Sequence, residues 1–341
     1  MEAIVDQIAS LVKQGKQALL VTSGAIAAGV EALGLEKRPS SIPKLQAAAS
    51  VGQGLLVHRY SDLFARHRVP VGQVLLTQFD TTHRQQYLNA RNTLTKLIEY
   101  GAVPVINEND TTAVDEIKFG DNDTLAAMVS LLAKADLLIL LSDICGLYSD
   151  DPRECSEAKL LEQIDEVTEK VEALAGGVGS AFASGGMTTK IQAAKIVTSA
   201  GIGMVIADGR EVNVVGRIAA GERVGTYFAP GSKSATDKKL WIAYGRIPQG
   251  TVVVDDGARK ALCFQGRSLL PAGVLEVRGR FSVGDAVDVA DPSGRIFARG
   301  LTNFASGELE KVKGLRTDDV ATKLPGLQNE EVVHRDCLAI L

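Results

Sequence analysis

The sequence predicts an α/β fold, in which a mainly parallel sheet is sandwiched by helices, followed by a second, smaller, mostly-β domain. Five short apolar runs are separated by segments of helical periodicity; they span residues 18–22, 71–77, 103–106, 137–141 and 204–207. Strands that are apolar on both faces and alternate with helices form parallel sheets covered on both sides. Beyond Trp241 the pattern changes to short strands with turn signals, for example at residues 255–257 and 291–294.

The elements follow in order along the chain. Ile4, Ile8 and Leu11 recur at helical spacing, so the chain opens in a helix. The five strand-like runs come next, and the α/β rhythm ends near residue 226. We therefore predict three parts: an α/β domain over residues 1–229, a linker over residues 230–244, and a mostly-β domain of barrel type, with one or two helices, over residues 245–341.

The bulk composition is that of a soluble globular protein. The 341 residues are 45% hydrophobic, which is enough for a large and a smaller core, and the net charge of −4 disfavours a dedicated nucleic-acid binder. No apolar run approaches the roughly 20 residues of a membrane-spanning helix. The four cysteines lack CxxC or Cys/His spacing, so we expect reduced thiols in a cytoplasmic protein. The four histidines show no ligand spacing, and we expect no metal site built by the protein alone.

Polar residues follow each of the apolar runs. These polar runs are Ser23-Gly24, Thr77-Gln78, Asn107-Glu108-Asn109-Asp110, Ser142-Asp143 and Asp208-Gly209. In a parallel sheet they lie along one edge, where ligands of open α/β sheets bind. The segment 103–123 is the most informative, because a second polar cluster, Gly120-Asp121-Asn122-Asp123, follows the first. Such crowded carboxylates and amides cost desolvation energy unless they bind a ligand; the alternative is a polar loop that caps a strand and a helix.

Two further motifs suit anions. Ser23, Gly24 and Ala25 stand where a strand turns into a helix, so exposed N–H groups and the helix dipole favour a carboxylate or phosphate there; the alternative is a serine N-cap. The run Ser184-Gly185-Gly186-Met187-Thr188-Thr189-Lys190 precedes a helix. Its glycines let the backbone wrap a phosphate, and Lys190 supplies charge; the alternative is a surface loop. Asp143 could contact a nucleotide or help to hold Mg²⁺, or it could cap a helix.

Together these segments resemble the amino-acid kinase family, and most closely its members that phosphorylate glutamate. The segments that carry the resemblance are TSGAIAAG at 22–29, QVLLT at 73–77, LNAR at 88–91, VPVINEND at 103–110, EIKFGDND at 116–123, LLSDICGLYSDDPR at 140–153 and SGGMTTK at 184–190. The C-terminal part resembles a PUA domain, in SLLPAGV at 268–274, FSVGDAV at 281–287 and VVHRD at 332–336. The order of the motifs is specific, whereas no single motif would be.

The resemblance implies an amino-acid kinase fold and transfer of the γ-phosphoryl group of ATP, with Mg²⁺, to the side-chain carboxylate of L-glutamate, the first step of proline biosynthesis. It implies that Ser23, Gly24, Asp110 and Asn122 bind the amino acid. Lys190 and Asp123 are the implied catalytic residues. The implied ATP-binding residues are Ser142, Asp143, Ser184, Gly185, Gly186, Met187, Thr188, Thr189 and Lys190.

The resemblance also implies partners and regulation. Proline would inhibit by competing at the glutamate pocket, with its control in the loop 111–119. A homo-oligomer, either a dimer or a tetramer, is expected, and the next enzyme of the pathway, glutamate-5-phosphate reductase, is a candidate partner. Two other functions stay open: an amino-acid kinase acting on aspartate, acetylglutamate, carbamate or a nucleotide, and an RNA-binding accessory protein acting through the PUA-like domain.

The chain departs from the family pattern at its start. Family members begin with a strand and a lysine-containing loop that touches the ATP phosphates, whereas this chain starts in the helix that follows. We expect that the natural protein begins upstream of Met1. If the chain is instead a genuine truncation, we expect weak or absent kinase activity, because a central strand would be missing from the sheet.

Overall fold

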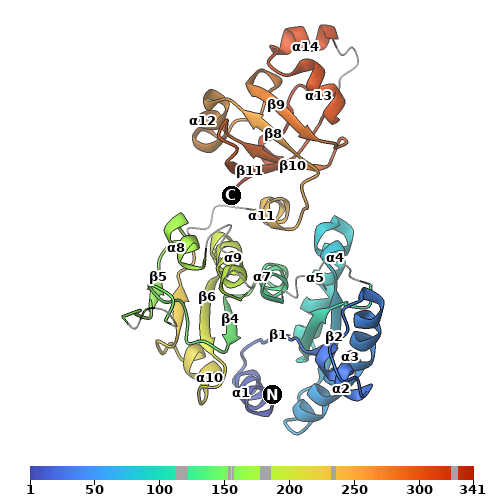
Figure 1. Ribbon diagram of the computed structural model, residues 1–341, viewed down its shortest axis with the longest axis vertical. Helices are drawn as coiled ribbons and strands as arrows, with labels where there is room; N and C mark the ends of the chain where they lie inside the picture. The colour runs from blue at the N-terminus through green and yellow to red at the C-terminus, as the bar shows by residue number, and fades with distance from the viewer. Residues whose placement is uncertain (113–121, 153–154, 156, 177–185, 232–235, 324–328) are drawn as a thin grey trace. The chain divides into compact units, whose positions relative to one another are not determined.

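The computed structural model describes residues 1–112, 122–152, 155, 157–176, 186–231, 236–323 and 329–341. The chain divides into two compact units, Met1–Lys233 and Ser234–Leu341, which are described separately (Figure 1). The first unit is α/β and the second is built on one sheet with short helices, so the predicted fold class is confirmed. No helix among the described residues is long and apolar enough to cross a membrane.

The described residues of the first unit form two sheets. The first sheet has the order β1-β3-β2, all parallel, with β1 at Leu20–Val21, β2 at Val71–Leu76 and β3 at Val103–Glu108. The second has the order β4-β6-β7-β5, with β4 at Leu137–Ser142, β5 at Gln163–Ile164, β6 at Gly203–Asp208 and β7 at Thr226–Phe228. Among these strands only β6 and β7 pair antiparallel. Each predicted apolar run overlaps a strand, whereas β5 and β7 lie outside the predicted runs.

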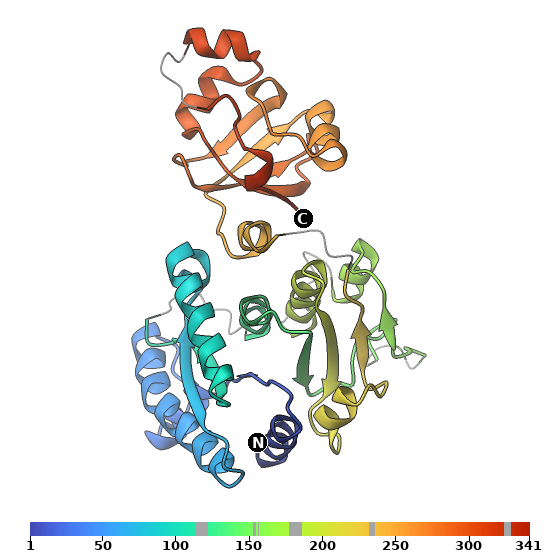
Figure 2. The same cartoon turned by 180° about the vertical axis from the view of Figure 1, so that it is seen from behind.

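Helices surround both sheets. They are α1 (Glu2–Lys13), α2 (Ala25–Ala32), α3 (Ile42–Ala65), α4 (Gln78–Thr82), α5 (Arg84–Glu99), α7 (Asn122–Ala133), α8 (Glu169–Leu174), α9 (Gly186–Ser199) and α10 (Val214–Ala219). Helix α7 lies between the two sheets and contacts β1 and β3 on one side and β4 on the other (Figures 1 and 2). Helix α1 also joins the two halves, because Ile4 packs into the apolar clusters of both.

The central strands are covered on both faces, as parallel strands require. Val103, Val105 and Ile106 of β3 are at most 1% exposed, and every residue of β6 is buried. The polar residues at the ends of these strands are therefore candidates for a functional site, because the strands themselves are buried and largely apolar.

The second unit holds a five-stranded sheet in the order β12-β11-β10-β8-β9. The strands are β8 (Gly250–Val254), β9 (Val274–Gly279), β10 (Ala286–Ala290), β11 (Ile296–Leu301) and β12 (Leu338–Ile340), and only β8 and β10 pair parallel. The helices are α11 (Asp237–Tyr244), α12 (Asp256–Gln265), α13 (Ser306–Val312) and α14 (Thr317–Lys323), with 3₁₀ turns η1 (Pro271–Gly273) and η2 (Arg335–Cys337). Helix α11 packs on β11 and β12, so part of the segment predicted as a linker is helical.

Candidate active site

The carboxyl edge of the first sheet gathers buried polar side chains from three elements. The parallel register of β1 and β3 sets Val21 beside Ile106, so the next residues, Thr22 and Asn107, emerge together. Asn107 is 2% exposed, and Gln53, from helix α3, is also buried. Helix α7 begins at Asn122 and brings that amide to the same place.

A chain of hydrogen bonds joins these groups. Asn122 Nδ2 donates to the carbonyl oxygen of Thr22 at 2.7 Å and to Asn107 Oδ1 at 3.2 Å. Asn107 Nδ2 donates in turn to Gln53 Oε1 at 2.8 Å. The Thr22 hydroxyl pairs with the hydroxyl of Tyr60, whose pKa is raised because the phenol is buried. The strand end, α3 and the start of α7 therefore form one hydrogen-bonded cluster.

The N-terminus of helix α2 stands beside this cluster. Its N-cap is Gly24, with a φ of 100°, and no side chain of the described residues caps the helix by a hydrogen bond. A positive φ of this size favours glycine. Ser23 and Gly24 are exposed, directly after the Thr22 carbonyl that binds Asn122. The exposed amide N–H groups of this turn and the helix dipole suit a carboxylate, as the sequence predicts.

Close packing of helices α2 and α3 holds that turn in place. A Cβ atom added at Gly52 would lie 1.8 Å from the carbonyl oxygen of Ala25, and one added at Gly29 would lie 1.7 Å from that of Ala48. Real Cβ atoms do not approach backbone so closely. The two glycines therefore permit the helix contact that sets the position of the α2 N-terminus.

A second group of contacts joins helix α7 to helix α9. Lys190 Nζ donates to Asp123 Oδ2 at 3.0 Å, and Thr189 Oγ1 donates to the same oxygen at 2.8 Å. The Lys190 and Asp123 side chains are 13% and 21% exposed, so the ion pair is largely shielded from water. Lys190 lies in the second turn of α9, where a cation opposes the helix dipole. Asp123 offsets that effect and holds the ammonium group in place.

The second sheet ends in another polar group. β4 and β6 pair in parallel with Ser142 beside Asp208, and the Ser142 hydroxyl donates to Asp143 Oδ1 at 3.3 Å. Arg210 binds both carboxylate oxygens of Asp208 and also donates to the carbonyl oxygen of Asp143. Hydrogen bonds from Arg210 lower the pKa of Asp208 to about 2, so this carboxylate stays charged at neutral pH.

The predicted residues thus fall into distinct groups. Asn122 lies beside Ser23 and Gly24, Asp123 pairs with Lys190, and Asp110 lies in the turn after β3. Residues 186–190 form the first turns of α9, where the Thr188 hydroxyl donates to the carbonyl oxygen of Ala175. Ser184 and Gly185 lie outside the described residues, as do residues 113–119 of the loop expected to mediate proline control.

The structure gives several polar residues roles that the sequence did not indicate. Thr77, at another predicted edge position, forms a capping box with Asp80 at the start of α4. Asn107 lies in the polar run after β3 and is not among the predicted site residues, and neither are Gln53 and Arg210. A polar residue directly after an apolar run was the available signal for Asn107. For Gln53, the only local signal is an amide in an otherwise apolar stretch of helix.

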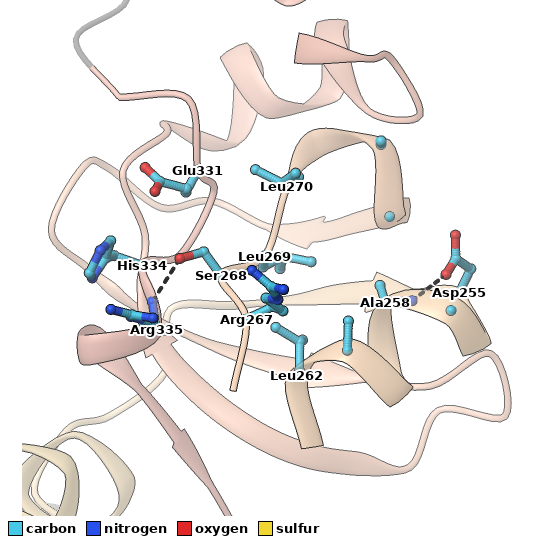
Figure 3. A pocket seen from close by; sticks show the side chains of 14 residues that line it. Asp255, Ala258, Leu262, Arg267, Ser268, Leu269, Leu270, Glu331, His334 and Arg335 are labelled. Atoms are coloured by element: carbon cyan, nitrogen blue, oxygen red, sulfur yellow. Dashed lines mark hydrogen bonds between the residues drawn. The ribbon is translucent and has the colours of Figure 1, made fainter. Parts of the chain in front are cut away.

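The second unit contains a separate concave site. A pocket of about 680 Å³ lies between α12, the loop 267–273 and the segment 331–335. Figure 3 shows Asp255 at one end and His334 and Arg335 at the other, with the amide of Arg335 bound to the Ser268 hydroxyl at 3.1 Å. Asp255 caps α12 by accepting from the Ala258 amide. The lining therefore combines both signs of charge with an apolar floor.

The comparisons with known proteins agree with this architecture. Residues 1–208 match the model of the amino acid kinase family, and residues 250–324 match that of the PUA domain. The chain belongs to the amino acid kinase family and carries a C-terminal PUA domain. Membership in this kinase family implies the use of ATP.

Its relatives point to one kind of kinase. The chain is 48% identical, over all its 341 residues and 92% of the relative, to the glutamate 5-kinase of Caldanaerobacter subterraneus subsp. tengcongensis. It is 49% identical to the glutamate 5-kinase of Carboxydothermus hydrogenoformans, over the whole chain and 91% of that protein. Among solved structures, a uridylate kinase from Archaeoglobus fulgidus is 19% identical, with a TM-score of 0.43 over 67% of this chain and 91% of that one.

Proposed function

We propose that the chain transfers the γ-phosphoryl group of ATP to the side-chain carboxylate of L-glutamate, giving glutamate 5-phosphate and ADP, the first step of proline biosynthesis. One observation carries the proposal. The consecutive residues Asn122 and Asp123 face two ways, the first toward the amide cluster of the first sheet and the second toward Lys190. A single helix start thereby joins a site suited to an amino acid with a site suited to phosphate.

In the acceptor half, we infer that Asn122 and Asp110 hold the amino group and that the α2 N-terminus at Ser23 and Gly24 holds a carboxylate. Amide and carboxylate oxygens accept from an ammonium group, whereas exposed backbone N–H groups donate to a carboxylate. The dense pairing among Gln53, Asn107 and Asn122 supports this role, because it limits the ways in which the amides can turn.

In the donor half, a side-chain oxygen of glutamate attacks the γ-phosphorus while the bond to the β-phosphate oxygen breaks, and ADP leaves. This reaction needs positioning and charge neutralisation more than a strong base. We assign the neutralising charge to Lys190, which Asp123 positions, and nucleotide contacts to Ser142, Asp143 and the turn 186–189. Among the described residues no three His, Cys, Asp or Glu side chains gather around a common point. We infer that Mg²⁺ binds through the ATP phosphates, its usual mode with nucleotides.

The same proposal extends to regulation and assembly. We infer that proline inhibits by competing with glutamate, since the two share an α-amino and an α-carboxyl group. We also infer that the protein forms a homo-oligomer in the cytoplasm and hands its unstable acyl phosphate to glutamate-5-phosphate reductase. These inferences rest on the relatedness to glutamate 5-kinases.

Trapping of the acyl phosphate by hydroxylamine tests the reaction. With L-glutamate, ATP and Mg²⁺ we expect γ-glutamyl hydroxamate to form, and we expect proline to slow its formation. Aspartate, acetylglutamate, carbamate and uridine monophosphate serve as alternative acceptors, with ADP release as the common readout. Faster ADP release with any of these acceptors than with glutamate would overturn the assignment.

A further inference from the structure

We propose that Gln53 is a positioning residue for the amino-acid substrate: through Asn107 it reinforces the orientation of the Asn122 amide that the carbonyl oxygen of Thr22 sets. This inference rests on the proposed function, because it concerns how Asn122 meets glutamate. Gln53 comes from helix α3 and contacts neither Asn122 nor Lys190 by any hydrogen bond among the described residues. Its effect on the substrate is therefore relayed by Asn107.

The orientations of the three amides can be followed from the backbone carbonyl of Thr22. The carbonyl oxygen of Thr22 only accepts hydrogen bonds, so the Asn122 atom that lies 2.7 Å from it must be the amide nitrogen. The same nitrogen lies 3.2 Å from Asn107, so the Asn107 atom that faces it must be the oxygen. The Asn122 Oδ1 acceptor then lies at the other end of the planar amide, where an ammonium group can bind it.

Gln53 completes the arrangement. With its oxygen turned to Asn122, Asn107 presents Nδ2 to Gln53 at 2.8 Å, so Gln53 must offer its oxygen there. An amide turned the other way would set two nitrogens or two oxygens against each other at each step. The carbonyl oxygen of Thr22, the residue after strand β1, thus sets the orientation of three side-chain amides, and Gln53 is the last of the three.

The burial of Gln53 indicates that the orientation of the three side-chain amides has a function. Gln53 is 9% exposed and Asn107 is 2% exposed. Gln53 Nε2 is shielded from solvent and has no hydrogen-bond partner among the described residues. An unpaired buried donor costs stability, and an apolar side chain of similar length would leave Asn107 Nδ2 unpaired in place of Gln53 Nε2. The position therefore keeps an amide whose oxygen accepts from Asn107 and whose nitrogen has no hydrogen-bond partner in the described part of the chain.

Two substitutions separate positioning from stability. Gln53→Met removes the acceptor and leaves Asn107 Nδ2 unpaired in place of Gln53 Nε2, so we expect little change in Tm. We expect the KM for glutamate to rise about three- to tenfold, the factor that one neutral hydrogen bond represents, while the KM for ATP stays the same. Gln53→Glu keeps an oxygen for Asn107, and we expect it to restore most of the glutamate affinity.

Leu56→Ala is the matched control, because Leu56 lies on the same helix, is buried and belongs to the apolar cluster. It should lower Tm without changing the KM for glutamate. An unchanged KM in Gln53→Met, or equal defects in Gln53→Met and Gln53→Glu, would overturn the inference. A wild-type protein that does not phosphorylate glutamate would instead refute the proposed function, so the two failures are distinguishable.

Discussion

A pair of glycines two residues apart on helix α3 offers a sharp test of how the fold builds the proposed acceptor site. Gly52 faces α2, where an added Cβ would lie 1.8 Å from the Ala25 carbonyl oxygen and 2.4 Å from the Gly29 nitrogen. Gly54 is exposed, and an added Cβ there would have nothing within 4 Å. The same substitution, Gly→Ala, therefore probes the helix contact at one position and helix propensity alone at the other.

The expected effects differ in sign. In Gly54→Ala the lower entropy of the unfolded chain should stabilise the protein by about 0.5–1 kcal/mol. In Gly52→Ala the helices must separate by about 1.5 Å to reach ordinary contact distance, which costs roughly 1–3 kcal/mol. At about 2–4 °C for each kcal/mol in a unit of this size, Tm should fall by several degrees. The displaced α2 N-terminus, with Ser23 and Gly24, should also bind glutamate more weakly.

Thermal unfolding and calorimetric titration of glutamate measure both effects. Gly52→Ala should lower Tm and weaken glutamate binding, whereas Gly54→Ala should raise Tm slightly and leave binding unchanged. Equal Tm values for the two variants would refute the reasoning from helix packing. A destabilised Gly52→Ala protein with full glutamate affinity would refute the link between that packing and the acceptor site.

Two further predictions concern charged groups away from that contact. The pKa of Asp208 is about 2 in the folded protein, below its ordinary value of 3.8, because Arg210 binds it. The stability that this ion pair adds to the fold is therefore complete above about pH 4 and is lost as the pH falls toward 2. Asp208→Asn should flatten that part of the stability curve in acid unfolding, and an unchanged curve would contradict the pairing. Arg299 binds the buried Asp288 and the carbonyl oxygens of Ala243 and Arg246, so Arg299→Met should destabilise the second unit by about 3–5 kcal/mol. The double variant with Asp288→Leu should recover much of that loss, and a double variant as unstable as the single would show that the charge left unpaired is not the cause.

Much of the fold was predictable because burial leaves a strong local signal. The apolar runs at residues 103–106 and 204–207 predicted β3 and β6, and the polar residues behind them predicted the edge of the site. Chain order alone did not reveal that the strands divide between two sheets. Strand β7 lies outside the predicted runs, because Gly225 and Thr226 interrupt the apolar pattern there.

The candidate site was predictable only in part, because its contacts join distant segments. Asn107 and Gln53 are 54 residues apart, and Asp123 and Lys190 are 67 apart. Motif resemblance suggested Asn122, Asp123 and Lys190, but nothing in the sequence indicates which side of α3 meets the end of β3. The role of Gln53 therefore became visible only when helix packing was known.

The central claim is that the start of α7 joins two separable half-sites, with Asn122 serving the amino acid and Asp123 serving Lys190. Calorimetric titration of glutamate, combined with the rate of hydroxamate formation, tests it in Asn122→Ala and Lys190→Met. We predict that Lys190→Met binds glutamate with wild-type affinity but turns over about 10²–10³-fold more slowly, the usual effect of removing a group that stabilises transition-state charge. Asn122→Ala should bind glutamate more weakly and bind ATP with wild-type affinity. Equal losses of glutamate affinity in the two variants would contradict the account.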